Sequence, residues 1–393
     1  MIKEYQYLLT ILNCFIHDQK PDPFEGDLSK LFQTADRHFL MGIVGYMLTK
    51  YPDEAVREKE IEIRKGYLKY IGYFSQTAQL MKVLISKLNE QEIDHLLMKG
   101  FVVKDYYPVP ELRTYGDIDF LIRKEDRKKS DDLMVSSGFR KKKDWEPVYN
   151  YVKGTEHYEI HTEIMEVDVS KKADYREYFS HTWERAKLLE GHSYVLSPED
   201  HLIYLLTHIA KHINGSGAGV RMYLDIAVYM KHFENKMDLN YLRGELEKLA
   251  LLPFTNFVFD LIRVYFDVDV KGWKSNVSKE ELEEFMTMTF DGGTFGTVGR
   301  DAGLITLKQA EKTENAVSRV KIVLNRLFPA AKTIENRYTY LQGKHWLIPV
   351  AWIHRLVITR KSFARHAKEA RDIINTDQAE VDRMKKLYRM LDL

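Results

Sequence analysis

Residues 1–90 carry apolar side chains at the spacing of helices. A first helix has apolar residues three or four positions apart, namely Leu8, Leu9, Leu12, Phe15 and Ile16. Pro21 and Pro23 then interrupt the pattern. A long element from about Asp53 to Leu88 has a second apolar stripe, which consists of Tyr67, Ile71, Phe74, Leu80, Val83 and Leu84. This part of the chain is therefore predicted to be helical.

The pattern changes at about Glu92, where short apolar runs alternate with turns that contain Gly or Pro. One helix, from Glu125 to Ser137, is expected among strand-like pieces at 95–98, 118–122, 139–143, 149–152 and 157–164. Ser197, Pro198 and Asp200 form a helix-start signature, and the chain then reads as helical to its end. We predict an α+β protein with a small mixed α/β core, residues 91–195, between helical regions 1–90 and 196–393.

Composition and charge are those of a soluble globular protein with two or three domains. The 393 residues exceed one ordinary core, and 45% are hydrophobic while 30% are charged. Lys and Arg number 59 against 58 Asp and Glu, so no global field favours a nucleic acid or an anionic membrane. The single cysteine, Cys14, lies in an apolar run and is predicted to be buried.

The apolar runs also favour a cytoplasmic protein. Residues 1–5 do not open like a signal peptide. No run reaches the roughly 18 apolar residues of a membrane-spanning helix, so no transmembrane segment is expected.

A lysine run, residues 141–143, begins one of the predicted strands. Such a run could contact a polyphosphate or a nucleic acid. More often it is a solvated sheet edge that prevents edge-to-edge pairing, and this is the interpretation we favour.

Asp117 and Asp119 flank Ile118 in a short strand and are the most informative feature of the chain. Alternate residues of a strand point to the same face, so both carboxylates emerge together while Ile118, Phe120 and Ile122 enter the core. Two like charges so close repel each other unless a cation lies between them. Mg²⁺ suits such an oxygen environment together with substrate phosphates. A solvated strand end is the alternative.

A second polar cluster lies on the predicted strand 157–164. Alternation places Tyr158, Ile160, Thr162 and Ile164 on one face and His157, Glu159, His161 and Glu163 on the other. Four titratable groups on one face need water, one another or a metal. An exposed sheet face and a functional site both fit this pattern.

A third cluster lies on the helices that follow. One helix face carries three histidines, His201, His208 and His212. After a glycine-rich loop at 214–219, Arg221 and Asp225 lie four residues apart. A histidine pair could ligate zinc, yet no third ligand of the usual spacing follows. The other possibilities are interdomain packing and a substrate-facing wall, in which Asp225 fixes Arg221 on a phosphate.

Together these motifs resemble the nucleotidyltransferase superfamily that includes DNA polymerase β and the aminoglycoside nucleotidyltransferases. That superfamily has an apolar strand, a glycine turn, a short helix, an Asp-x-Asp strand and a later third acid. More narrowly, Met-Lys-Gly at 98–100, Arg-x-x-Gly-Asp-Ile-Asp at 113–119 and Glu-Ile-His at 159–161 resemble a poorly characterised bacterial nucleotidyltransferase family. The Lys-Gly turn and the long interval from 100 to 117 depart from the wider superfamily and match the narrower family.

The resemblance implies a Mg²⁺ (or Mn²⁺) site formed by Asp117, Asp119 and Glu159. Glu159 would be the third acid, on a strand antiparallel to the Asp-x-Asp strand, and would act as a metal ligand or general base. Glu163 is the fallback for this role. His161 would contact a phosphate or orient the acceptor.

Positive charge for phosphoryl chemistry would come from Lys99 and Arg113. Gly100 would let the backbone approach a phosphate at a helix start. Arg113 could equally pair with Asp117 and do nothing else.

The narrower family also shows His-x-x-x-His, a glycine-rich loop and Arg-x-x-x-Asp. His208, Arg221 and Asp225 are therefore expected on the substrate side. The helical region would close over the α/β core, with Arg221 pointing towards the three acids.

Two later stretches complete the pattern. The glycine-rich loop 291–297 resembles one in the family; a plain turn is favoured there and phosphate binding is the alternative. Residues 346–357 are the most apolar stretch, and Pro349 suits a helix start. A core-facing helix is predicted, with peripheral membrane contact as the alternative.

We predict a metal-dependent nucleotidyltransferase that moves a nucleoside monophosphate from an NTP to a hydroxyl of a small molecule, sugar or protein. The alternative is a non-catalytic protein on the same fold that binds a nucleotide or a partner. Intact Asp117, Asp119 and Glu159 favour the enzyme. Nothing in the sequence names the base or the acceptor, and a nucleic-acid partner is not evident.

Overall fold

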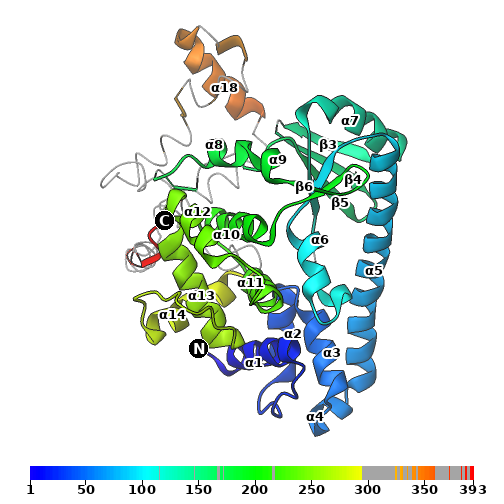
Figure 1. Ribbon diagram of the computed structural model, residues 1–393, viewed down its shortest axis with the longest axis vertical. Helices are drawn as coiled ribbons and strands as arrows, with labels where there is room; N and C mark the ends of the chain where they lie inside the picture. Colours follow the sequence, from blue (N-terminus) through cyan, green and yellow to red (C-terminus); the bar gives the residue numbers. More distant parts are fainter. Residues whose placement is uncertain are drawn as a thin grey trace.

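A seven-stranded mixed sheet lies among many helices in the computed structural model of the chain (Figure 1). The structure describes residues 1–293, except 115, 146, 166–168, 171 and 215–216. Beyond residue 293 it describes 324, 328–330, 334, 339–341, 344–358, 371, 382, 386 and 390–393. The predicted α+β class is confirmed.

The chain begins with five helices: α1 (Lys3–His17), α2 (Leu28–Arg37), α3 (Met41–Lys50), α4 (Glu54–Arg57) and the long α5 (Glu60–Glu90). The apolar positions predicted for the first helix are buried in α1, and Cys14 is buried with them. On α5 the buried stripe consists of Ile63, Tyr67, Phe74, Thr77, Met81, Leu84 and Leu88. The assignment of Val83 to that stripe is wrong, because the stripe passes through Met81 and leaves Val83 47% exposed.

The strands are β1 (His95–Leu97), β2 (Ile118–Ile122), β3 (Arg140–Trp145), β4 (Val148–Lys153), β5 (Glu156–His161), β6 (Lys187–Glu190) and β7 (Ser193–Val195). Their order is β3-β4-β5-β2-β1-β7-β6. The lysine run at 141–143 is therefore on an edge strand. Helix α6 (Lys99–Val103) follows β1, and α7 (Arg127–Ser136) follows β2.

Strands β2 and β5 are parallel, with Asp119 beside Glu159 in the register. The expected antiparallel pairing is wrong. Helix α7 returns the chain after β2, and β3, β4 and β5 then alternate in direction, so β5 runs the same way as β2. Adjacent residues in register point to the same face, which still brings the two carboxylates together.

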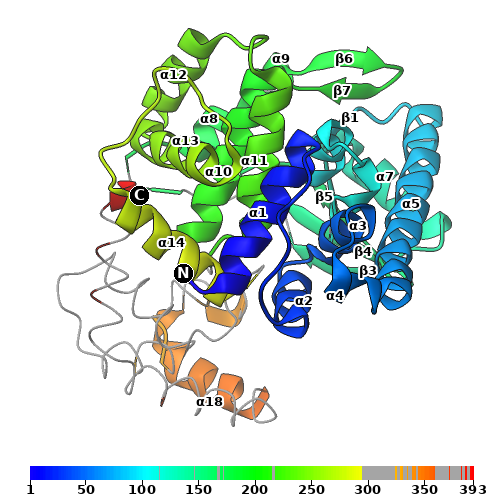
Figure 2. The ribbon, with the colours of Figure 1, turned by 90° about the horizontal axis from the view of Figure 1, so that it is seen from below.

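The sheet separates two apolar cores. Helices α5 and α7 cover one face, where Ile118, Phe120 and Ile122 join Tyr158 and Ile160. Leu96 and Leu121 lie in the larger core on the other face, with α10 (Pro198–Asn214) and α11 (Val220–Phe233). Figure 2 shows the sheet between α5 with α7 on one side and α10 with α11 on the other.

The remaining helices in this part of the chain are α8 (Tyr175–Ser180), α9 (Thr182–Arg185), α12 (Leu239–Lys248), α13 (Leu252–Phe266) and α14 (Lys279–Gly292). The predicted start of α10 is confirmed, because the Asp200 N–H donates to Ser197 Oγ at 3.1 Å. The amino-terminal helices pack against the later ones: His38 Nε2 contacts the Phe290 carbonyl at 3.0 Å. Helical segments before and after the sheet therefore share one core. The boundaries at 90 and 195 stay a prediction.

The last apolar stretch forms α18 (Ile348–Ile358), in which Pro349 is the second residue, so the predicted helix start is confirmed. The expectation that this helix faces the core is wrong for one of its sides, since Val350 and Ile353 are 53% and 64% exposed. Ala351 is buried and packs with Ile334 and Leu341. Of the glycine-rich loop 291–297, residues 294–297 lie outside the described residues. Within the described part of the chain, none of the helices has the length and apolar character needed to cross a membrane.

Candidate functional site

Ten of the residues selected from the sequence as site residues line one cleft of about 390 Å³ between the sheet and helices α10 and α11. These residues are Lys99, Gly100, Arg113, Asp117, Asp119, Glu159, His161, His208, Arg221 and Asp225. They come from segments as far apart as β2 and α11, so the fold gathers them. Their individual roles stay predictions.

The acids lie on the cleft side of β2 and β5. Asp119 is buried within β2, with its side chain 3% exposed, and Glu159 on β5 is 28% exposed. Asp117 immediately precedes β2 and is exposed to the cleft. His161 Nε2 lies 2.9 Å from Asp119 Oδ1 and 3.9 Å from Glu159 Oε2.

The three carboxylates differ in the direction in which their pKa values are shifted. Burial raises the pKa of Glu159, and the charges of Asp119 and Asp117 add to it. Asp117 also has a raised pKa, first from desolvation in the cleft and then from Asp119. Burial alone would raise the pKa of Asp119, but Lys99 and His161 reverse this and hold it well below its usual range. Of the three acids, Asp119 is therefore the one whose charged form is most favoured by its neighbours.

Lys99 is the cation closest to the acids. Its Nζ donates to Asp119 Oδ1 at 2.5 Å, and its own pKa is raised by the same carboxylate against the opposing effect of burial. The backbone of Lys99 has a φ of +52°, which is uncommon for a residue with a side chain. Strained backbone of this kind tends to occur at functional sites.

Gly100 is required by Arg113. A Cβ on Gly100 would lie 1.9 Å from Arg113 Nη1, a distance that no side chain could tolerate. The group that approaches the backbone of Gly100 closely is thus the guanidinium of Arg113. Any larger residue at position 100 would push Arg113 out of place.

Arg113 pairs with Asp225 through two hydrogen bonds, Nε to Oδ1 at 3.0 Å and Nη2 to Oδ2 at 2.5 Å. Tyr107 donates to the same carboxylate at 2.7 Å. The expectation that Asp225 fixes Arg221 is therefore wrong. Of the two possibilities left open for Arg113, the pairing with Asp117 does not occur. Asp225 accepts from Arg113 and Tyr107 and not from Arg221, its neighbour in α11. Its ion pair is therefore with Arg113, a residue 112 positions away in the sequence.

Arg221 lies in the cleft with a different set of contacts. Its Nη1 donates to the Thr114 carbonyl and to Thr114 Oγ1, both at 2.8 Å. Its Nε has no hydrogen-bond partner, and no carboxylate of the described residues forms an ion pair with it. Burial, and then the charge of Arg113, lower its pKa to about 10. Arg221 is thus a cation held in place by neutral groups.

His208 and His212 face the cleft as a pair, with their Nε2 atoms 3.0 Å apart. Burial is the main reason why the pKa of His208 is far below its usual value and that of His212 is about 4. His201 is buried elsewhere, with its ring 5.4 Å from that of Tyr229, so the three histidines do not form one site. In the described part of the chain, the histidine pair belongs to no cluster of three potential ligands.

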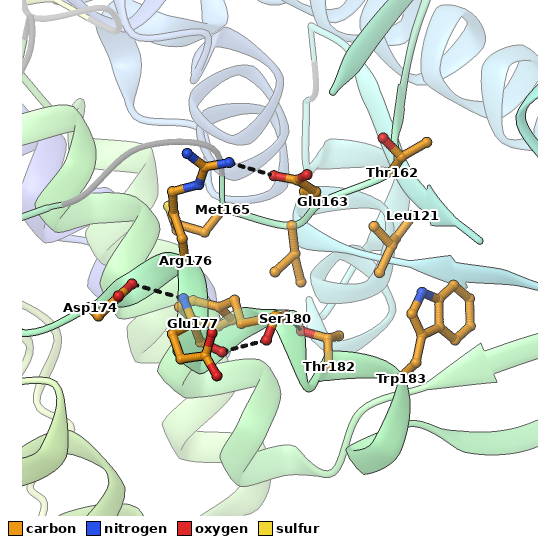
Figure 3. A pocket seen from close by; sticks show the side chains of 12 residues that line it. Leu121, Thr162, Glu163, Met165, Asp174, Arg176, Glu177, Ser180, Thr182 and Trp183 are labelled. Carbon is orange, nitrogen blue, oxygen red and sulfur yellow. Dashed lines mark hydrogen bonds and ion pairs between the residues drawn. The ribbon is translucent and has the colours of Figure 1, made fainter. Parts of the chain in front are cut away.

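Glu163 is not part of the cleft. Strand β5 ends at His161, so the alternation predicted through 164 stops there. Glu163 pairs with Arg176 at 3.3 Å in a second pocket of about 530 Å³, beside α8 and α9 (Figure 3). It is therefore unsuited to serve as the fallback acid.

Sequence reasoning missed the contribution of Thr114 and Tyr107. Thr114 offers its carbonyl to both Arg113 and Arg221. The only local signal was its position next to Arg113. Tyr107 carried no signal, because its partner Asp225 lies 118 residues away.

Asp119, Glu159 and His161 fit a divalent cation. Each offers one ligand atom, and these atoms lie within 4.8 Å of one another. Carboxylate oxygens suit Mg²⁺ and Mn²⁺, and an imidazole nitrogen is a common ligand of transition metals. The raised pKa values of Asp117 and Glu159 indicate that added positive charge would stabilise the cluster.

Comparison with known proteins adds one match. The model of a family described as uncharacterised nucleotidyltransferase matches residues 25–267, which include the whole cleft. No curated protein and no solved structure matches the chain.

Proposed function

Because the chain belongs to the uncharacterised nucleotidyltransferase family, we propose that it transfers a nucleoside monophosphate from an NTP to a hydroxyl group. The acceptor would be a small molecule, a sugar or a protein. The convergence of the Asp119, Glu159 and His161 ligand atoms within 4.8 Å is the observation that carries this proposal.

Asp117, Asp119 and Glu159 would hold Mg²⁺ or Mn²⁺, with His161 beside them. When bound, the ion would neutralise charge on the phosphates and on the departing pyrophosphate. The parallel pairing of β2 and β5 fixes Asp119 and Glu159 side by side. Their positions therefore depend on rigid strands, which suits a site that needs accurate placement.

Lys99 and Arg221 would contact the triphosphate. Arg221 is held through one nitrogen by Thr114, which leaves a buried guanidinium edge without an anion among the described residues. A guanidinium binds phosphate oxygens through planar, charge-assisted hydrogen bonds. Arg113, in contrast, is neutralised by Asp225 and would act by supporting the Lys99–Gly100 turn.

Glu159 would accept the proton of the attacking hydroxyl. The hydroxyl oxygen would bond to the α-phosphorus as the bond to the β-phosphate oxygen breaks and pyrophosphate leaves. The raised pKa of Glu159 brings it closer to neutral pH, which favours general-base action. His208 and His212, kept neutral by burial, would line the acceptor side.

We also propose that residues 91–195 form a polymerase-β-like core inserted between the helical regions. The mixed sheet with helices on both faces supports this placement. The arrangement puts the cleft where α10 and α11 meet the core.

Labelled transfer tests the proposed activity. The protein would be incubated with each α-³²P-labelled NTP, with Mg²⁺ or Mn²⁺, and with a cell extract as the source of acceptor. We expect metal-dependent transfer of label from at least one NTP, its loss in Asp119→Asn, and its retention in Glu163→Gln, whose carboxylate lies in the second pocket. Metal-dependent nucleotide binding without any transfer would instead support a non-catalytic nucleotide-binding protein.

A further inference from the structure

One carboxylate oxygen in the cleft is shared by two donors. Lys99 Nζ lies 2.5 Å from Asp119 Oδ1, and His161 Nε2 lies 2.9 Å from the same atom. Since a carboxylate only accepts, the His161 nitrogen that faces it must carry a proton. Asp119 Oδ1, which would ligate a metal, is therefore already engaged by both Lys99 and His161.

Lys99 already supplies the counter-ion that a buried carboxylate needs. The side chain of Asp119 is 3% exposed, and a buried charge is costly unless it is paired. A divalent cation entering this site without a nucleotide would approach the ammonium of Lys99 and meet its repulsion. It would also have to break the ion pair between Lys99 and Asp119, whereas at a solvated carboxylate it would displace only water.

The backbone of Lys99 is fixed, whereas its side chain has rotational freedom. Its backbone is held in the left-handed region, next to Gly100, on which Arg113 packs. Asp225 holds Arg113 through two hydrogen bonds. The four-carbon stem of Lys99 nonetheless has several rotatable bonds, so its Nζ can leave Asp119 while the backbone stays in place.

We propose that Lys99 is a displaceable counter-ion of Asp119 that makes metal binding depend on the nucleotide. Without nucleotide, its ammonium occupies Asp119. The polyphosphate of an incoming NTP attracts the ammonium, Lys99 moves from the carboxylate to the phosphates, and the divalent cation takes its place among the acids. Metal and nucleotide thus enter together. This inference rests on the proposed function, because it assigns the phosphates of an NTP to the cleft.

Mn²⁺ binding tests the proposal without measuring activity. Electron paramagnetic resonance of free Mn²⁺ would be recorded with the wild type, with Lys99→Met and with Lys99→Arg. Each would be measured alone and with the α,β-methylene analogues of the four ribonucleoside triphosphates. Lys104→Met is the matched control, since Lys104 lies five residues further on and pairs with Asp105 outside the cleft. Thermal unfolding would show that each variant is folded.

We expect the wild type to bind Mn²⁺ at least about tenfold more tightly with an analogue than without one. Without nucleotide, Lys99→Met should bind Mn²⁺ at least about tenfold more tightly than the wild type. The reason is that the substitution removes one positive charge that repels the ion. Lys99→Arg and Lys104→Met should resemble the wild type in nucleotide-free Mn²⁺ affinity. Lys99→Met should also bind the analogues alone more weakly.

Two results would overturn the proposal, and they can be told apart. If the wild type binds Mn²⁺ with an analogue but Lys99→Met gains no nucleotide-free affinity, the counter-ion role fails and the proposed function stands. If the wild type and the variants bind no Mn²⁺ with or without the analogues, the metal site of the proposed function fails as well.

Discussion

The two faces of the sheet differ in their side chains, although strands β2 and β5 contribute residues to both faces. One face is apolar and the other carries the acids of the cleft. On the face covered by α5 and α7, Phe120 and Ile160 are fully buried among apolar side chains. On the opposite face, the neighbouring residues Asp119 and Glu159 share the cleft with Lys99. Alternation along a strand makes this possible, since successive side chains point to opposite faces.

The comparison suggests that alternate residues of each strand have different roles, one set in stability and the other in the site. The apolar face supplies burial that fixes the strands, and the fixed strands hold acids that repel one another. Burial of an aromatic side chain contributes several kcal/mol, which can offset the cost of placing carboxylates side by side. Stability and chemistry should therefore be separable by mutating alternate residues.

The largest effect is expected from Glu159→Gln. If Glu159 is a general base or metal ligand, its loss should lower the transfer rate by on the order of 10²–10⁴. An acid whose folded-state pKa is raised destabilises the fold once it ionises, so at neutral pH the variant should be as stable as the wild type or more stable. Steady-state kinetics and denaturant unfolding would measure the two quantities.

Glu163→Gln is the matched control for that variant and should cost little, because its carboxylate pairs with Arg176 outside the cleft. The reverse ranking of the two variants would place the general base in the second pocket.

Phe120→Ala tests the other face. Truncating a fully buried Phe typically costs about 3–5 kcal/mol of unfolding free energy. At a temperature where the variant remains folded, nucleotide-dependent Mn²⁺ binding should persist. Denaturant unfolding and Mn²⁺ titration would be compared in one preparation. Loss of Mn²⁺ binding in folded protein would mean that the two faces are not independent.

A smaller effect is expected from Arg221→Lys. Lysine cannot copy the planar contact of a guanidinium, and a hydrogen bond to a charged group contributes about 1.5–3 kcal/mol. Transfer should fall roughly 10- to 100-fold, while the melting temperature changes little. An unchanged rate with a lowered melting temperature would make Arg221 a structural residue.

The smallest effect concerns pH and should come from His208 and His212 in the cleft. The pKa of His212 is lowered to about 4 and that of His208 lies well below its usual value, so both favour the neutral form when folded. A base with a depressed folded-state pKa contributes stability that is complete above its unfolded pKa of about 6.5 and is lost on acidification towards 4.

Unfolding free energy should accordingly fall by on the order of 1 kcal/mol for each histidine between about pH 7 and 5.5. The double variant His208→Gln and His212→Gln should have a flatter profile over this interval than the wild type. His157→Gln, at an exposed position, serves as the control. Equal slopes in all three proteins would contradict the assignment.

Two features with a local signal were predicted correctly from the sequence. Alternation in β2 and β5 correctly separated Phe120 and Ile160 from Asp119 and Glu159. The helix start at Ser197 also depended only on residues within one turn.

Features that depend on distant partners could not be predicted in the same way. The spacing of Arg221 and Asp225 predicted that they pair, whereas Asp225 binds Arg113, which lies 112 residues away in the sequence. The direction of β5 depended on how many reversals follow α7. The end of β5 at His161, which removes Glu163 from the cleft, coincides with the first residue of its partner strand, because Val148 at the start of β4 pairs with His161.

The central claim is that the acids of β2 and β5 hold a divalent cation together with a nucleotide. Anomalous X-ray diffraction from crystals containing Mn²⁺ and the α,β-methylene analogue of the NTP that is bound tests it most directly. We expect an anomalous peak in contact with the carboxylates of Asp119 and Glu159, the phosphates beside Arg221, and Lys99 Nζ moved away from Asp119. A nucleotide bound in the cleft with no manganese at these carboxylates would contradict the claim.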